Sequence, residues 1–488
     1  MKQILVWFGL LFIAFLPNEI HSQQKQRPFI LVKLSERSQI LEKIENQTWA
    51  KDIYERLKLR TDVQVEQFYK NPTAYIKKLP FNWSEESTSN FPPFFKTRHV
   101  ANGVQENLDN ATDEEWKPAE LLIEYLQVAL DCGELYFLTQ DEKYAYVAST
   151  ILYSFLKSVQ QSEVSDWHGR GGWLFPYDGF REVRVIGYRL PLIYDFIHSY
   201  LKNEGKAFDI IQNKKVNFPF EEAQNVFKTY ANITVNYGQT GSNHCALEAP
   251  SLVFNALAMD DETEREKWLS YFLTESTDNQ DALNIMVKNY KNQGDIWPET
   301  SQYLNHTTSI LARLMLVVNK YNPSLKLGEK YPNVLHALPR LDYFVYPNNE
   351  IVRWGDGHRS AHAPYEAFEN AYALAKMDGL KEIQDKFIPL INRAIGKGKY
   401  KREGSEALFW YDDDFDNESA TIELSRTDRV YHAGIVLQRN LSSTNNPKDG
   451  LMCFVGGAHM VHGHAEGMNI ELYGEGQVLG VDNGRKRY

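Results

Sequence analysis

The spacing of apolar residues divides the chain into a long helical stretch and a shorter stretch of strands. Between residues 117 and 395, apolar residues recur at three- and four-residue intervals, the period of one helix face. After about residue 400, apolar and polar residues alternate, as in half-buried strands. We expect helices over residues 41–57, 119–137, 143–159, 181–201, 220–235, 243–259, 265–273, 282–290, 301–321, 365–377 and 380–395. We expect strands over residues 420–424, 430–437, 451–456, 468–473 and 478–481.

Many paired helices without intervening strands indicate an α/α toroid, in which helical hairpins form a ring and their loops line a cleft. No repeat of fixed period is visible, so this expectation rests on the number of helices. We therefore predict a multidomain α+β fold, with an N-terminal incomplete (α/α) toroid followed by an antiparallel β-sandwich domain. Five strands of about five residues make a thin sheet, so we expect this β-domain to be truncated.

The N-terminus has the features of a secretory signal peptide. Lys2 supplies a positive charge, and residues 4–16 form an apolar run too short to span a bilayer. No later segment is apolar enough for a membrane span, so we expect a soluble protein that is secreted or periplasmic. The predicted segments are the signal peptide at residues 1–23, a mixed wrapping segment at 24–110, the toroid at 111–400 and the start of the β-sheet domain at 401–488.

Composition narrows the class of partner. The 488-residue chain carries a formal net charge of −11, which argues against a nucleic-acid partner. An anionic substrate would need a local basic cleft in this acidic body. The 28 Tyr, 26 Phe and 10 Trp suit stacking on sugar rings, although large cores use aromatic residues too. Three widely spaced cysteines imply neither a disulfide framework nor a cysteine-based zinc motif.

A histidine-rich stretch near the C-terminus suggests a metal site. His462 and His464 are two residues apart, so a strand would project both from one face. Asp482 follows 18 residues after His464 (482 − 464), about one strand, a turn and a second strand later. Imidazole nitrogen and carboxylate oxygen suit Zn²⁺. Surface histidines of a β-hairpin are an equally good interpretation of this spacing.

Two helix starts carry further candidate residues. Asn243 and His244 begin a helix, where backbone N–H groups favour an anion, and Glu248 lies one turn later on the same face. An ordinary N-cap asparagine would explain Asn243 as well. Glu299 precedes a second helix, and Tyr303 lies on its first turns. A tyrosine acts as acid or base when a nearby cation lowers its pKa, although most tyrosines serve packing.

Basic residues near these helices could line an anionic cleft, since arginine binds carboxylates and sulfates in matching geometry. Solvated surface charge is the alternative for each one taken singly. The candidate substrate-binding residues are Arg170, Arg184, Glu248, Glu299, His358 and Arg359.

Taken together, the Asn-His helix start, the Pro-Glu-x-x-x-Tyr helix and the His-Gly-His stretch followed by Asp resemble the heparinase II/III-type polysaccharide lyases. The resemblance covers roughly residues 110–488. It implies that Asn243 and His244 neutralise a uronate carboxylate, that Tyr303 is base, acid or both, and that His462 is a second catalytic histidine. It also implies that His464 and Asp482 bind a mainly structural zinc ion. The chain departs from the family pattern at Glu466, where aspartate is usual, and a third zinc ligand is not in this chain.

The resemblance implies β-elimination on a uronate-containing anionic polysaccharide of the ulvan, alginate or glycosaminoglycan type. A homodimer is compatible with the sequence. Neutralising the carboxylate makes the C5 proton removable, and an acid then protonates the departing O4. Two alternatives remain. A toroid glycoside hydrolase would use a carboxylate pair from Asp178, Glu182, Glu299 and Asp356. A glycan-binding envelope protein without catalysis would also explain the aromatic residues and the export signal.

Overall fold

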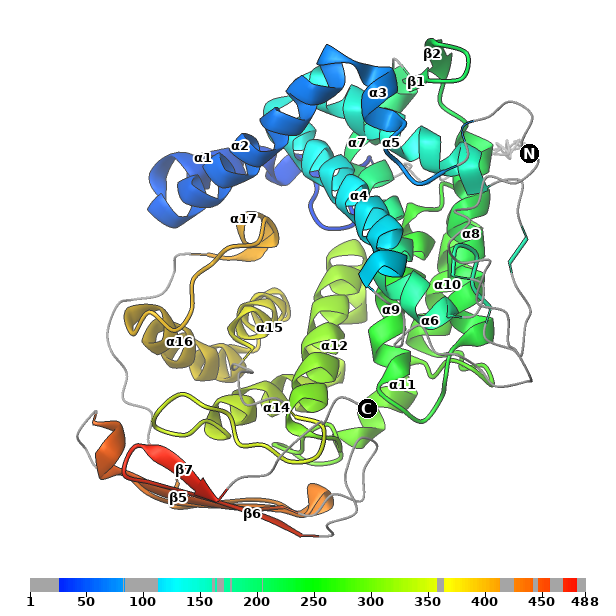
Figure 1. Cartoon of the computed structure of the whole chain (residues 1–488). Helices are drawn as coiled ribbons and strands as arrows, with labels where there is room; N and C mark the ends of the chain where they lie inside the picture. The colour runs from blue at the N-terminus through cyan, green and yellow to red at the C-terminus, as the bar shows by residue number, and fades with distance from the viewer. Residues whose placement is uncertain are drawn as a thin grey trace, which may run out of the picture.

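The computed structural model describes residues 26–81, 83, 113–159, 163–164, 171–175, 178–203, 205–357, 364–412, 425–441, 446–456 and 468–480. In this part of the chain, helices dominate up to Trp410, and a five-stranded antiparallel sheet follows (Figure 1). The sheet lies beyond α14, at the opposite end of the molecule from α2 and α3. The predicted order, a helical region followed by an antiparallel sheet, is confirmed.

The helical region contains α1 (Arg37–Asn46), α2 (Thr48–Lys70), α3 (Pro72–Ile76), α4 (Asp113–Thr139), α5 (Glu142–Val159), α6 (Gly179–Glu182), α7 (Arg189–Asn203), α8 (Phe220–Tyr237), α9 (His244–Ala258), α10 (Glu262–Leu273), α11 (Leu283–Met286), α12 (Ser301–Tyr321), α13 (Leu327–Lys330), α14 (Pro332–Tyr343), α15 (Tyr365–Met377), α16 (Lys381–Gly396) and α17 (Glu406–Trp410). A short hairpin of β1 (Lys206–Asp209) and β2 (Lys214–Asn217) interrupts them. Among the described residues, no helix is long and apolar enough to cross a bilayer.

Helix packing follows the toroid pattern. Helices α4, α7, α9, α12 and α15 pack against one another in that order, while α5, α8, α10, α14 and α16 pack on them. Residues of the first set line a central cavity, which identifies these helices as the inner ones. Because an outer helix follows each inner helix along the chain, we expect the outer helices to return the chain and the inner helices to run parallel. The N-terminal ends of α7, α9 and α12 therefore lie on the same side of the ring.

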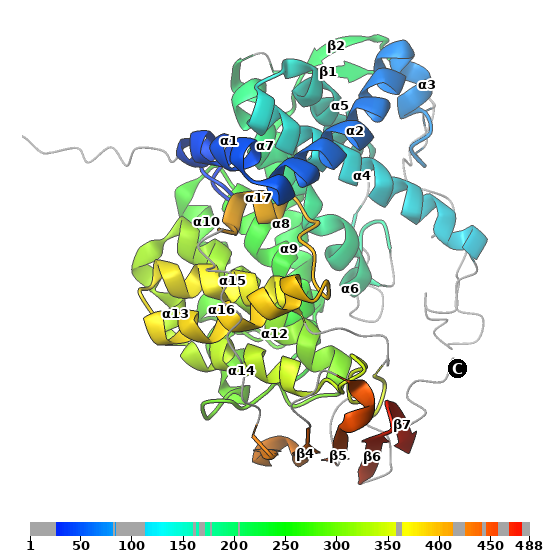
Figure 2. The same ribbon diagram turned by 90° about the vertical axis from the view of Figure 1, so that its left-hand side faces the viewer.

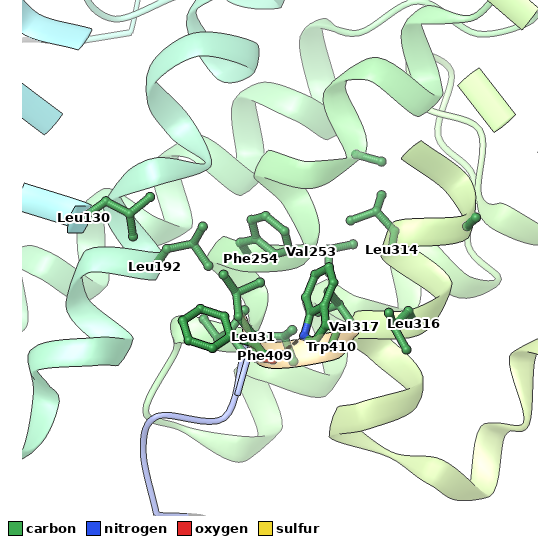
Figure 3. Packing of buried hydrophobic residues seen from close by; sticks show 14 of the residues in the cluster. Leu31, Leu130, Leu192, Val253, Phe254, Leu314, Leu316, Val317, Phe409 and Trp410 are labelled. Carbon is green, nitrogen blue, oxygen red and sulfur yellow. Dashed lines mark hydrogen bonds between the residues drawn. The ribbon is translucent and has the colours of Figure 1, made fainter. Parts of the chain in front are cut away.

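Segments from both ends of the helical region meet at the centre of the ring. Figure 3 shows Leu31 beside Phe409 and Trp410, with Leu192 and Phe254 of the inner helices around them. The Trp410 indole Nε1 donates a 2.7 Å hydrogen bond to the Leu31 carbonyl. Helix α17 lies between α1 and α15 and contacts both, so it links the last inner helix to the N-terminal helices (Figure 2).

Three predicted helices differ from the structure. The helix expected over 41–57 is broken at Gln47, whose extended backbone separates α1 from α2. The helix expected over 181–201 is interrupted by a π-helical turn, Val183–Gly187. The helix expected over 282–290 is the short α11 followed by a 3₁₀ turn. Helix α14 was not predicted. It contains Pro332 and Pro339, and Pro332 occupies a first-turn position where proline is tolerated.

The C-terminal sheet has the order β3 (Thr427–Val430), β4 (Ile435–Asn440), β5 (Leu451–Gly456), β6 (Asn469–Gly474) and β7 (Gln477–Gly480). The single strand expected over 430–437 is wrong, because the chain turns at Tyr431–Ala433 and Gly434 takes a φ of +61°. The strand expected over 420–424 lies outside the described residues. Within the described ranges there is one sheet of the predicted sandwich, and the boundaries of the predicted domains stay predictions.

One face of the sheet packs on the segment that follows α14. The Phe454 ring stacks on Trp354 at 5.1 Å, and Tyr473 stacks on Tyr346 at 5.2 Å. Between them, the buried Glu471 carboxylate accepts hydrogen bonds from the Tyr346 hydroxyl (3.1 Å) and the Arg353 amide (3.0 Å). The other face carries exposed apolar side chains: Leu451, Ile470, Leu472 and Leu479.

This packing predicts that Glu471 holds the sheet on the helical region. Glu471→Ala would leave the Tyr346 hydroxyl and the Arg353 amide without this acceptor, at a cost of about 1–3 kcal/mol for the buried hydroxyl. We expect faster hydrogen exchange in β5 and β6, measured by mass spectrometry, and a lower free energy of unfolding in urea. Leu472→Ala, on the exposed face, is the matched control and should change little. Equal effects of the two substitutions would contradict this account.

Helix α4 carries a buried carboxyl group that faces the central cavity. Glu134 is 2% exposed, and its Oε1 accepts a 2.8 Å hydrogen bond from the Ser405 hydroxyl. Burial, together with the neighbouring Asp131 carboxylate, raises the pKa of Glu134 from 4.5 to about 8. The folded protein therefore keeps a proton on Glu134 that the unfolded chain has lost near neutral pH.

A raised pKa in the folded state predicts that stability falls as pH rises between about 4.5 and 8, by at most about 1.4 kcal/mol per pH unit for this proton. Glu134→Gln should remove that part of the slope, because glutamine cannot ionise. The measurement is urea unfolding of both proteins between pH 5 and 8.5. Glu124→Gln, at an exposed position of the same helix, should leave the slope unchanged. Parallel curves for the wild type and Glu134→Gln would show that this carboxyl group does not contribute.

Candidate active site

The N-terminal end of α9 carries the two most distinctive candidate residues. Asn243 precedes the helix, but its side chain makes no capping hydrogen bond. It is 1% exposed, and its Oδ1 has no hydrogen-bond partner among the described residues. Ser242 supplies the local cap, since its hydroxyl accepts from the His244 amide at 3.3 Å. The Asn243 side chain is thus buried without a capping role, which favours a functional role over the ordinary N-cap interpretation.

His244 lies in a three-residue contact that sequence analysis predicted only in part. Its Nδ1 is hydrogen-bonded to Nη2 of Arg184 and lies 3.3 Å from Oε1 of Glu248. The same Arg184 Nη2 donates to Glu248 Oε1 at 2.8 Å. The Phe180 ring packs on the imidazole at 5.2 Å. The spacing of His244 and Glu248 on one helix face was foreseen, whereas the position of Arg184 depends on the π-helical turn, a feature often found at functional sites.

Glu248 is the buried centre of this contact. It is 1% exposed, so its charge is compensated by Arg184 rather than by solvent. Gly238, at the C-terminal end of α8, lies against it. A Cβ at Gly238 would lie 3.1 Å from Glu248 Oε2 and only 2.5 Å from the Asn279 carbonyl oxygen. Glycine is therefore required here to let the turn pass close to the carboxylate.

A second group of residues surrounds the start of α12. Tyr303 is half-buried on the first turn of this helix. Glu299 lies two residues before α12 begins and is 2% exposed. Its Oε2 accepts a 2.9 Å hydrogen bond from the Trp297 indole. The structure thus places Glu299 inside the loop that leads into α12. Its predicted contact with substrate stays a prediction.

The C-terminal sheet touches this loop through His432. The His432 Nε2 lies 2.7 Å from the Ile296 carbonyl oxygen, and its Nδ1 lies 3.2 Å from Asp295 Oδ1. This contact was not predicted, because His432 and Ile296 are 136 positions apart and no sequence pattern relates them. It places the sheet beside the loop that carries Glu299 and leads to Tyr303.

A cavity of about 1030 Å³ lies between the inner helices and the α17 segment. This volume is at the upper end of the range for ligand pockets. Arg184 lies on its wall, so the contact with His244 adjoins the cavity. Its lining is rich in aromatic and charged side chains: Tyr188, Tyr365, Tyr400, Tyr411, Arg313, Lys399, Lys401, Glu134, Glu366, Glu403 and Glu406.

His306 also lines the cavity and was missed by sequence analysis. It follows Tyr303 by three residues, a spacing that places both on one side of α12 and could have revealed it. Partial burial lowers the pKa of His306, so the side chain is mainly neutral near pH 7.

Several predicted site residues lie outside the described residues: Arg170, His358, Arg359, His462, His464 and Asp482. Their roles stay predictions, including the proposed zinc ligands. Among the residues that the structure describes, no group of three His, Cys, Asp or Glu side chains has the arrangement of a metal site.

Three of the four carboxylates considered for glycoside hydrolysis, Asp178, Glu182 and Glu299, have structural partners; the role considered for Asp356 stays a prediction. Glu182 is fully buried, and its Oε2 accepts hydrogen bonds from three consecutive amides, at residues 173–175. Asp178 caps α6 by accepting from the Arg181 amide at 3.1 Å. With Glu299 also buried, these three carboxylates do not form an exposed pair across a cleft.

Comparison with known proteins finds an ulvan lyase family model and an ulvan lyase relative. Residues 293–420 match the family model of the endo-acting ulvan lyase second domain. This match includes the loop before α12 and Tyr303. The chain is also 27% identical over 498 aligned residues to an endo-acting ulvan lyase from Formosa agariphila. That alignment covers 97% of this chain and 57% of the relative, so the chain spans little more than half of the relative's length.

Two solved structures also match at low identity. A heparinase III is 12% identical, with a TM-score of 0.44, covering 92% of this chain and 66% of the other. The heparan sulfate lyase HepC from Pedobacter heparinus is 12% identical, with a TM-score of 0.44, covering 90% and 64%. The predicted resemblance to polysaccharide lyases is confirmed by the ulvan lyase family model over residues 293–420 and by the similarity to the Formosa agariphila ulvan lyase.

Proposed function

We propose that this chain cleaves a uronate-containing anionic polysaccharide by β-elimination, and that ulvan is the first substrate to test. The observation that carries the proposal is the buried Asn243 next to His244, whose hydrogen-bond partner Arg184 lines the ring cavity. The similarity to an endo-acting ulvan lyase supports the reaction class and the choice of glycan.

The site has groups suited to a uronate carboxylate. The N-terminal end of α9 contributes the positive end of the helix dipole. Asn243 and His244 lie at that end and can donate hydrogen bonds to carboxylate oxygens. Neutralising the carboxylate stabilises the enolate-like intermediate that forms when C5 loses its proton.

The proposed reaction needs one base and one acid. The C5–H bond breaks and its proton moves to the base, the C4–O4 bond breaks, and a C4=C5 double bond forms. The acid returns a proton to O4 of the leaving sugar. We assign Tyr303 as base, acid or both, because it begins the inner helix next to α9. His462 is proposed as the second catalytic histidine.

Further parts of the proposal concern residues outside the described ranges. We propose that residues 1–23 direct export, so that the protein acts in the periplasm or outside the cell. We also propose that His464 and Asp482 bind a zinc ion with a structural role. No step of the reaction above depends on that metal.

The reaction is tested by ultraviolet absorbance of the unsaturated uronate product. We expect absorbance to rise with ulvan, or with another member of a panel that includes alginate and heparan sulfate. Tyr303→Phe should lower the rate by about 10²–10⁴-fold, the usual contribution of a general acid or base. The matched control is Tyr69→Phe, which removes a half-exposed hydroxyl from α2.

New reducing ends without any absorbance would contradict the lyase assignment and favour a hydrolase. An unsaturated product formed at equal rates by the wild type and Tyr303→Phe would keep the reaction class but reject Tyr303 as acid or base.

A further inference from the structure

The contact between Arg184 and His244 determines which ring nitrogen of His244 carries a proton. A guanidinium group has only donors and stays charged in proteins. Arg184 Nη2 is hydrogen-bonded to Nδ1 of His244, so Nδ1 must accept with its lone pair. A neutral imidazole with an accepting Nδ1 carries its proton on Nε2.

The Nε2 side of the ring is free to bind a ligand. No described residue is hydrogen-bonded to Nε2, and the side chain is 25% exposed. In this tautomer Nε2–H is a donor and cannot accept a proton from a substrate. A carboxylate is the partner that such a donor suits.

We propose that Arg184 is a positioning residue that keeps His244 in the Nε2–H tautomer, so that His244 binds the uronate carboxylate and does not act as the base. The catalytic part of this inference rests on the proposed function, whereas the tautomer does not. Another residue must then be the base that removes the C5 proton, and Tyr303 is the candidate.

Glu248 makes the role of Arg184 necessary. Its Oε1 lies 3.3 Å from Nδ1, close enough to accept a hydrogen bond from an Nδ1–H group. Without Arg184, this carboxylate would favour the opposite tautomer, with an accepting Nε2 facing the ligand. Arg184 prevents this because it donates to both Nδ1 and Oε1. The π-helical turn holds Arg184 at this position.

The first test is nitrogen NMR of protein labelled with ¹⁵N-histidine, without any substrate, at pH 7.5. The His244 signals are assigned by their loss in His244→Gln. In the wild type we expect a protonated Nε2 and an unprotonated Nδ1. Arg184→Leu should shift the signals toward the Nδ1–H tautomer, and Arg184→Lys should restore the wild-type pattern. Arg181→Leu, which removes the neighbouring arginine that pairs with Asp178, is the control and should change nothing.

A wild-type protein with the Nδ1–H tautomer, or with both nitrogens protonated, would overturn the proposal. A wild-type pattern retained in Arg184→Leu would overturn the role of Arg184. Because this measurement needs no activity, a failure of the proposed lyase function leaves its result intact.

The second test uses two substitutions at His244. The glutamine amide nitrogen can take the place of Nε2, whereas the asparagine amide nitrogen can take only the place of Nδ1. If His244 is a donor through Nε2, His244→Gln should keep kcat/KM within about tenfold of the wild type, and His244→Asn should lose much more. A loss of about 10²–10⁴-fold in both variants would make His244 a base and contradict the proposal.

Discussion

The buried carboxylate of Glu248 is the constraint on which the candidate site depends. At 1% exposure it needs a cationic partner, because an unpaired charge in the interior is costly. Arg184 meets that need and thereby ties the π-helical turn before α7 to the second turn of α9. The same arginine nitrogen reaches His244, so one ion pair sets the position and the tautomer of the histidine. Gly238 leaves the space in which this arrangement fits.

The ring architecture explains why residues far apart in sequence share one site. Parallel inner helices direct the N-terminal ends of α7, α9 and α12 to one side, where Arg184, His244 and Tyr303 are found. The sheet adds His432 on the loop that leads into α12. The cavity continues from Arg184 between the inner helices toward α17, whose Trp410 is bonded to Leu31. The inner helices α4, α7, α9, α12 and α15 thus form the ring and also line its cavity.

The sequence predicted those helices whose position is set by apolar spacing and by turn residues. The helix over Ser301–Tyr321 and the helix start at Asn243–His244 follow from apolar spacing and turn residues, and both are present. Features that depend on tertiary contacts were missed. The π-helical turn at Val183–Gly187 has no period of its own, and the Arg184 contact joins residues 60 positions apart. The predicted strand over 430–437 is split at Gly434, which has a left-handed backbone. The sequence alone does not show whether a glycine adopts this conformation or an extended one.

Elimination and hydrolysis differ in whether water enters the product, and this difference tests the account most directly. Ulvan, or whichever uronate polysaccharide the protein degrades, would be digested in water enriched in ¹⁸O and the products weighed by mass spectrometry. The account predicts that the fragments add up to the mass of the intact chain, with no ¹⁸O and one fragment ending in an unsaturated uronate. Fragments that together gain one water per cleavage, carrying ¹⁸O, would contradict it.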